Sequence, residues 1–275
     1  MSNIHGVGFL DTVGAYFGFK TADGKPRVSC TDYLYDIAEG NISGHTAWSK
    51  IGYNGDVDVG TEDMISQGGQ YAFRATETQM AIVSSNDNDG KTGGATCTGV
   101  RTVTLYYLDD EFTEKTEDIT LNGTTSVSTT ATDIYRVNSL RVKTCGTNGF
   151  AVGNITLATG GVTYGYIALG QTRQRQCVYT VPKLKTLYIT SISFSVGGAT
   201  KEKAAVFTTL AKYDDKADVA TTFFLPYTEV IIEDNAHSKQ LEVPLKIVAG
   251  VDLKVQVRGF VADCMCSCAL RGWIE

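Results

Sequence analysis

Residues 100–108, VRTVTLYYL, decide the fold class of this chain. Val103, Leu105 and Tyr107 alternate with polar or amphipathic residues, and this two-residue period is typical of a β-strand that is buried on one face. The segment therefore predicts a strand that packs its apolar face on a core. The opposite face carries Thr102, Thr104 and Tyr106.

Similar segments occur on both sides of this strand. Residues 115–128 are predicted to be a strand, an Asn122-Gly123 turn and a second strand, because Asn-Gly is a strong hairpin signal. Other strands are predicted over 78–84, 133–144, 150–158, 162–169, 186–196, 204–213, 222–233, 241–248 and 253–261.

Two of these predicted strands contain residues that indicate a bulge or a place in the sheet. The apolar face of residues 186–196 switches phase after Ile189, which predicts a β-bulge or a strand buried on both sides. Pro244 interrupts the polar face of residues 241–247, and proline in a sheet favours an edge strand.

Many strands without intervening helices predict an all-β, antiparallel β-sandwich or jelly roll. Two stacked sandwiches divided near residue 180 are the alternative. Composition agrees: the chain has 35 Thr, 29 Gly and 14 Tyr but only 4 Pro, and Thr and Tyr favour strands.

The charge balance and hydropathy argue against several classes of protein. The net charge is −6, with 24 Lys and Arg against 30 Asp and Glu, and this balance does not favour nucleic-acid binding. A hydrophobic fraction of 43% argues against disorder. Without a run of 18 apolar residues or a charged, apolar leader, we expect no membrane segment and no secretory signal.

Residues 1–75 differ in composition and periodicity from residues 76–275. They are rich in Gly, and their one predicted helix, over residues 32–38, is short. We expect residues 1–75 to form an extended, mostly irregular arm, and residues 76–275 to form the sandwich. Such an arm would anchor on the main domain or a partner chain through its aromatic residues. The interaction candidates are Trp48, Tyr53 and Tyr71.

Seven cysteines are an odd and sparse set, so we expect mostly reduced thiols in a protein made in a cytosol. Cys264, Cys266 and Cys268 would share one face of a strand, spaced about 6.5–7 Å apart. That spacing suits neither one zinc ion nor a disulfide between neighbours. Core packing is the favoured interpretation, with a metal or an interchain bridge as alternatives.

No motif predicts catalysis. His5, His45 and His237 are far apart and have no neighbouring ligands. Acidic residues near DVDVGTED (residues 56–63) lack the spacing of an EF-hand loop, so solvated turns are favoured over a Ca²⁺ site. We therefore expect neither an enzyme nor a cofactor or metal protein.

Four segments together resemble a known group of sequences. GNISGHTAWSKIGYNGDVDVGTEDMISQGGQY (40–71), RTVTLYYLDDEFTEKTEDITLNGTTSVSTTATDIYRVNSLRV (101–142), YTVPKLKTLYITSISFS (179–195) and CALRGWIE (268–275) are similar to a family of uncharacterised tailed-bacteriophage proteins. Its members are presumed to be virion components. The family has a Pro-Ala-Gly-Lys-type turn after Val181, where this chain has Pro182-Lys183-Leu184-Lys185. Without Gly, a turn with positive φ is harder to form.

The resemblance implies a non-enzymatic structural protein of a virion, made in the cytoplasm of a bacterial host. We expect a capsid decoration, cement or spike protein, a homotrimer that attaches to the major capsid protein or another virion protein through its N-terminal region. A receptor- or glycan-binding module of a tail fibre or tail tip is the alternative. Neither membrane nor nucleic acid is an expected partner.

Overall fold

The computed structural model describes residues 19–20, 26–27, 33–90, 97–198, 203–213 and 224–275. Its contacts divide the chain into two units, residues 1–46 and 47–275. In the first unit, β1 (Phe19–Lys20) pairs antiparallel with β2 (Pro26–Arg27), and α1 spans Tyr33–Ala38. The helix is the one the sequence predicts, and it ends before Gly40, whose φ is 76°. Of the helices described, none is long and apolar enough to cross a membrane.

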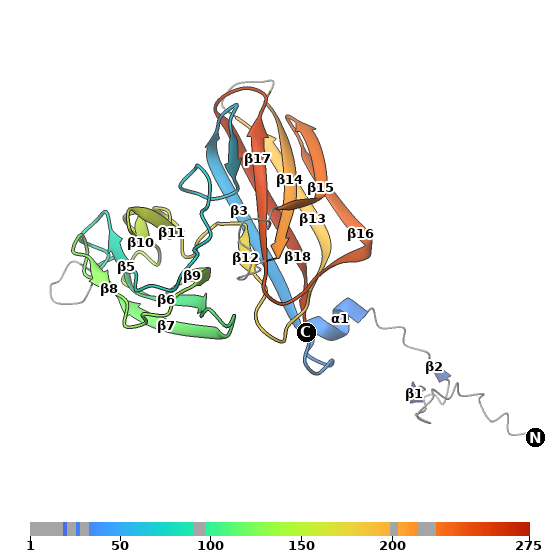
Figure 1. The fold of residues 1–275 in the computed structure, drawn as a ribbon, viewed down its shortest axis with the longest axis horizontal. Helices are drawn as coiled ribbons and strands as arrows, with labels where there is room; N and C mark the ends of the chain where they lie inside the picture. The colour runs from blue at the N-terminus through green and yellow to red at the C-terminus, as the bar shows by residue number, and fades with distance from the viewer. Residues whose placement is uncertain (1–18, 21–25, 28–32, 91–96, 199–202, 214–223) are drawn as a thin grey trace, which may run out of the picture. The chain divides into compact units, whose positions relative to one another are not determined.

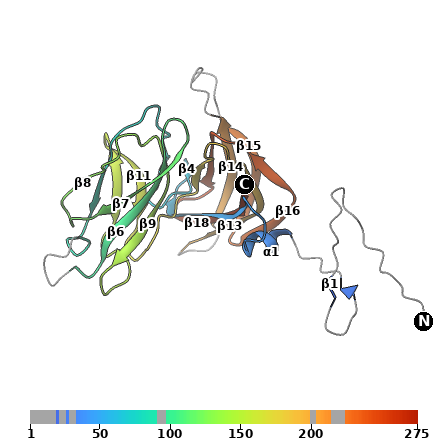
Figure 2. The ribbon, with the colours of Figure 1, turned by 90° about the horizontal axis from the view of Figure 1, so that it is seen from below.

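The second unit contains two β-sandwiches, each with its own hydrophobic core (Figure 1). We call the sandwich of β5 to β11 the first sandwich. Its two antiparallel sheets have the orders β11-β10-β5-β8 and β7-β6-β9 (Figure 2). The strands are β5 (Ala81–Ser84), β6 (Val100–Leu108), β7 (Glu114–Thr120), β8 (Val127–Ser128), β9 (Arg136–Cys145), β10 (Ile155–Thr159) and β11 (Val162–Ile167).

The second sandwich contains β3, β4 and β12 to β18. Its sheets have the orders β12-β17-β14-β15, with β4 added on β17, and β16-β13-β18-β3. Phe194 and Phe207, which come from opposite sheets, stack in its core with ring centroids 4.9 Å apart. The strands are β3 (Thr46–Val57), β4 (Thr61–Asp63), β12 (Val178–Thr180), β13 (Leu187–Gly197), β14 (Ala204–Tyr213), β15 (Leu225–Glu233), β16 (Ala236–Ile247), β17 (Val251–Gly259) and β18 (Cys264–Ile274).

The all-β, antiparallel sandwich class predicted from the sequence is confirmed, and the alternation in β6 holds. Val103 and Leu105 are fully buried, whereas Tyr106 on the other face is 37% exposed. The phase switch in residues 186–196 is a β-bulge, because the pairing of β13 with both neighbours shifts between Ile189 and Ser191. Pro244 lies in β16, which is an edge strand of its sheet.

Two local expectations are corrected. Residues 46–63 lie inside the expected arm 1–75, yet they form β3 and β4 of the second sandwich. Their partner strands come from the far end of the chain, so local periodicity carries little of the signal. The expected 115–128 hairpin is also absent, because β7 pairs with β6 while β8 pairs with β5. The Asn122-Gly123 turn, with φ 59° at Gly123, carries the chain from one sheet to the other.

The first sandwich is thus an insertion between β4 and β12 of the second. The chain passes from the first sandwich back to the second within β12. Val178 packs in the core of the first sandwich, and Tyr179 packs in the core of the second. This crossing lies close to residue 180.

Buried polar contacts join the two sandwiches. The Arg136 guanidinium on β9 donates to both carboxylate oxygens of Asp252 on β17, at 2.8 and 2.9 Å. Beside this pair, the Asn138 side chain donates to the Thr180 carbonyl at 2.9 Å and accepts from the Thr180 amide at 2.8 Å. Bidentate charged pairs demand one geometry, so these contacts define how the sandwiches are joined.

The turn at 182–185 adopts the conformation that its sequence disfavours. The Lys185 amide donates to the Pro182 carbonyl at 3.2 Å, and Leu184 has a φ of 62° and is 90% exposed. A positive φ costs a residue with a side chain about 1–2 kcal/mol, and an exposed Leu side chain regains little of that cost by burial.

We expect Leu184→Gly to raise the free energy of unfolding by about 0.5–1 kcal/mol, because Gly relieves the strain but loses some chain entropy. Urea unfolding of both proteins measures the change. Leu184→Ala is the matched control, since it removes the side chain and keeps the strain. If Leu184→Gly were no more stable than Leu184→Ala, strain at this turn would not be the cause.

Candidate functional site

The three aromatic interaction candidates occupy different environments. Trp48 is partly buried on β3 and meets the Tyr179 ring edge to face, with centroids 5.2 Å apart. Tyr53 is partly buried, and the Arg175 guanidinium lies 5.9 Å from its ring centroid. Tyr71 is only 6% exposed and packs in the core of the first sandwich. Tyr71 is therefore a core residue rather than an exposed anchor, and Trp48 lines a cavity.

That cavity is a solvent-open cleft of about 370 Å³ between the two sandwiches. β3 contributes one wall through residues 47–50, and β12 contributes Tyr179. The first sandwich contributes the other wall through β6, the first residue of β7, β9 and the segment before β12. These lining residues are Tyr106, Glu114, Asn138, Ser139, Arg141 and Arg173.

Strand pairing explains why these side chains meet. Tyr106 on β6 is the direct partner of Ser139 on β9, and Arg141 follows Ser139 on the same face of that strand. An isolated antiparallel bridge places Arg173 opposite Arg141. The outer polar face of the first sandwich thereby becomes one wall of the cleft.

The cleft is cationic. Arg141, Arg173 and Lys50 line it together with a single carboxylate, Glu114. Among the residues that the structure describes, none of the three cations forms an ion pair with a carboxylate. Arg141 donates to the Ser139 hydroxyl at 3.2 Å, and its guanidinium lies 5.2 Å from the Tyr106 ring centroid. In a chain of net charge −6, such a concentration of positive charge favours an anion.

The Lys50 ammonium is held in an unfavourable environment. It donates to the Asn138 carbonyl and lies 5.6 Å from the Tyr179 ring centroid. Burial lowers the pKa of Lys50 to about 8, and the neighbouring Arg141 also acts to lower it. A negative ligand in the cleft would act in the opposite direction and stabilise the ammonium.

A smaller recess of about 30 Å³ shares much of the wall of the cleft. Gln174 lines it, is 7% exposed, and has a buried side-chain oxygen without a hydrogen-bond donor. An unpaired buried acceptor is costly. The residues common to the recess and the cleft are Ser49, Lys50, Ser139, Arg141 and Arg173.

The cysteine row lies in the core. Cys264, Cys266 and Cys268 are at most 3% exposed on one face of β18, which is the packing that the spacing favours. Burial raises the pKa of Cys266 to about 12. Such thiols behave as small apolar side chains and are poorly reactive.

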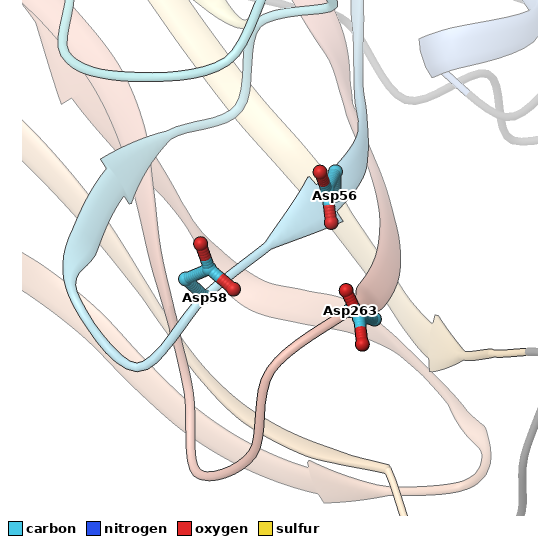
Figure 3. Close-up of side chains that lie close together, drawn as sticks. All are labelled: Asp56, Asp58 and Asp263. Carbon is cyan, nitrogen blue, oxygen red and sulfur yellow. The ribbon is translucent and has the colours of Figure 1, made fainter.

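The acidic segment 56–63 divides into two environments. Asp56 and Asp58 are exposed and lie near Asp263, their carboxylate oxygens within 4.8 Å of one another (Figure 3). Exposed carboxylates commonly gather in this way without holding an ion. Asp63 differs from the solvated turn residue expected at this position, because it is fully buried and pairs with Lys254 at 3.0 Å. The partner lies on β17, far along the chain.

The cleft residues other than Trp48 are not evident from the sequence alone. Tyr106 on the polar face of 100–108 and Arg141 in the strand 133–144 are each unremarkable locally. The one available signal is an aromatic residue and a cation on the outward faces of two predicted strands. It becomes informative only once β6 and β9 are known to be neighbours.

Comparison of the sequence with protein-family models and with curated proteins finds no match. Among solved structures, the chain is similar at 11% identity to one described as the structure of infectious bursal disease virus Gt strain. The similarity covers 89% of this chain and 77% of that one, with a TM-score of 0.16. A second is the VP2 subviral particle of that virus, at 12% identity, coverages of 84% and 71%, and a TM-score of 0.13. Scores this low carry no argument.

Proposed function

We propose that this protein is a non-enzymatic structural component of a bacteriophage virion, a capsid decoration, cement or spike protein. It attaches to the major capsid protein or another virion protein through its N-terminal region and assembles as a homotrimer. The phage and virion assignments rest on the sequence resemblance. The buried Arg136–Asp252 junction supports a rigid building block rather than a protein with moving domains.

The observation that carries the proposal is an open edge of the second sandwich. β15 and β16 follow one another in the chain and are edge strands of opposite sheets. Their large exposed apolar side chains include Ile231 at 66%, Val243 at 79% and Tyr227 at 45% exposure. An unpaired edge with apolar side chains favours association with another chain, and a second copy of the protein is the proposed neighbour.

The full chain should be a trimer by light scattering at micromolar concentration, and Val243→Lys/Ile231→Lys should be a monomer. Two lysines on the edge oppose burial because their charges must lose water. Lys183→Glu, which changes an exposed charge elsewhere, is the control and should leave the trimer intact. A monomeric full chain, or a trimer that survives both lysines, would contradict this assembly.

Attachment is tested separately. Residues 46–275 keep β3 and therefore both sandwiches, so this truncation should fold and should lose binding to particles of the encoding phage. Cosedimentation of labelled protein with those particles measures the loss. Undiminished attachment of residues 46–275 would show that residues 1–45 are not the anchor.

Carbohydrate binding is a second candidate, favoured by the cleft with Trp48, Tyr106 and Tyr179 in its walls. A glycan array probed with the full chain should then show signals that Tyr106→Ala abolishes. Tyr35→Ala removes an exposed tyrosine of α1, outside the cleft and the β15–β16 edge, and should leave those signals unchanged. An array without signal for the unaltered chain would remove this candidate.

A further inference from the structure

We propose that the cleft between β3, β6 and β9 binds an acidic saccharide, with its carboxylate on Arg141 and Arg173 and one hydroxyl in the Gln174 recess. The inference rests on the second proposed function, carbohydrate binding, and specifies its ligand class. It does not depend on the assembly or the attachment of the protein.

Charge selects an acid. Arg141 and Arg173 sit opposite one another across an antiparallel bridge, and both line the cleft without a carboxylate partner among the described residues. Guanidinium groups recognise carboxylates through paired, charge-assisted hydrogen bonds. Lys50 adds a third positive charge from the opposite wall, on β3, where its ammonium already donates to the Asn138 carbonyl.

Size and surface select a ring. A volume of about 370 Å³ lies near the lower limit of about 300–1,000 Å³ for small-molecule sites, which suits a mono- or disaccharide. Tyr106 presents its side chain to solvent at 37% exposure, and Trp48 and Tyr179 form an aromatic pair on the other wall. Rings that combine an apolar body with a polar tip suit the mixed faces of a pyranose.

The recess selects a hydroxyl donor. Gln174 lines the recess of about 30 Å³, which has room for one small polar group. The Gln174 side-chain oxygen is buried and lacks a donor, and a small shift of this side chain would bring it to a ligand hydroxyl in the recess. Inorganic phosphate could satisfy the cations but would not reach both the recess and the aromatic walls. The carboxylate, ring and hydroxyl together distinguish an acidic sugar from a simple anion.

Isothermal titration of the full chain with short oligogalacturonates and with sialyllactose tests the proposal. At least one of these acids should bind. Its methyl ester should have an affinity lower by about tenfold or more, since the ester keeps the ring and removes the charge. Lactose tests a sugar ring without a charge, and inorganic phosphate tests a charge without a ring. Both should bind more weakly than the acid.

Variants locate the binding. Arg141→Gln/Arg173→Gln should weaken binding of the acid by about tenfold or more, equivalent to about 1.4 kcal/mol. Lys239→Gln, an exposed lysine on β16, is the matched control. Gln174→Leu should weaken the acidic sugar and leave the affinity for phosphate unchanged, a difference that a folding defect would not produce.

Each contrary result has a definite meaning. If neither acid binds, the proposal is wrong. If acid and ester bind equally but Tyr106→Ala abolishes both, carbohydrate binding stands and the acidic class is wrong. If phosphate or a nucleoside monophosphate binds as tightly as the acidic sugar, the cleft is a general anion site and the saccharide assignment fails.

Discussion

Replacing Arg136 by methionine is expected to lower the free energy of unfolding by about 3–5 kcal/mol, because Asp252 would remain buried without its counter-charge. The Arg136 and Asp252 side chains are 4% and 1% exposed. The loss goes beyond one ion pair, since Arg136 also donates to the Arg74 carbonyl at 2.6 Å and stacks 3.9 Å from the Tyr135 ring centroid. The Asp252 pair connects β9 of the first sandwich to β17 of the second, whereas the Arg74 carbonyl lies in the segment between β4 and β5.

Urea unfolding measures this change, and two further variants identify its cause. Arg136→Met/Asp252→Leu removes both charges and should recover much of the lost stability, because an apolar pair can replace a buried ion pair. Lys183→Met breaks the exposed Lys183–Glu111 pair and should have a much smaller effect, because water screens that pair. A double variant no more stable than Arg136→Met would assign the loss to the stacking and the Arg74 contact.

Replacing Asp89 by alanine is expected to destabilise the first sandwich by about 3 kcal/mol or more, since several buried donors would lose their acceptor. The Asp89 carboxylate is fully buried. It accepts hydrogen bonds from the amides of Val100 at 2.7 Å, Gly153 at 2.8 Å and Val152 at 3.1 Å, and from the Ser84 hydroxyl at 2.8 Å. One side chain thus ties the ends of β5 and β6 to the loop before β10.

Thiol reactivity gives this prediction a local readout. Cys97 and Cys145 are partly buried beside this loop, where Cys145 pairs with Val100. In Asp89→Ala both thiols should react faster with a thiol-specific reagent, together with the drop in urea stability. Asp87→Ala is the control, because Asp87 is exposed and, among the residues that the structure describes, accepts only from Thr124. Equal effects of the two substitutions would mean that burial of Asp89 is not what matters.

Strand identity was predictable because it is local. The alternation of Val103, Leu105 and Tyr107 states which face of β6 is buried, whichever strands lie beside it. The β13 bulge and the edge position of Pro244 follow for the same reason: a phase change and a missing amide are properties of one strand. The row of Cys264, Cys266 and Cys268 was also predictable from local sequence, since its spacing alone places the thiols on one face.

Strand pairing was not predictable in the same way. The Asn122-Gly123 turn suits a hairpin, yet the packing of two sheets sends β7 and β8 to different partners. Segment 46–63 lacks clear periodicity because its neighbours, β17 and β18, supply the core that it packs on. Asp63 resembles a solvated turn residue until Lys254 is known to lie beside it.

The sequence by itself determined that this chain is an antiparallel β protein, which strand faces are apolar, and where several strands bend or lie at an edge. These properties depend on residues a few positions apart. Only the tertiary structure decided that the first sandwich is inserted within the second, and that Lys50, Tyr106, Arg141 and Arg173 line one cleft. Those residues are separated by up to 123 positions of chain, and long-range packing of two sheets, rather than any local pattern, sets which of them meet.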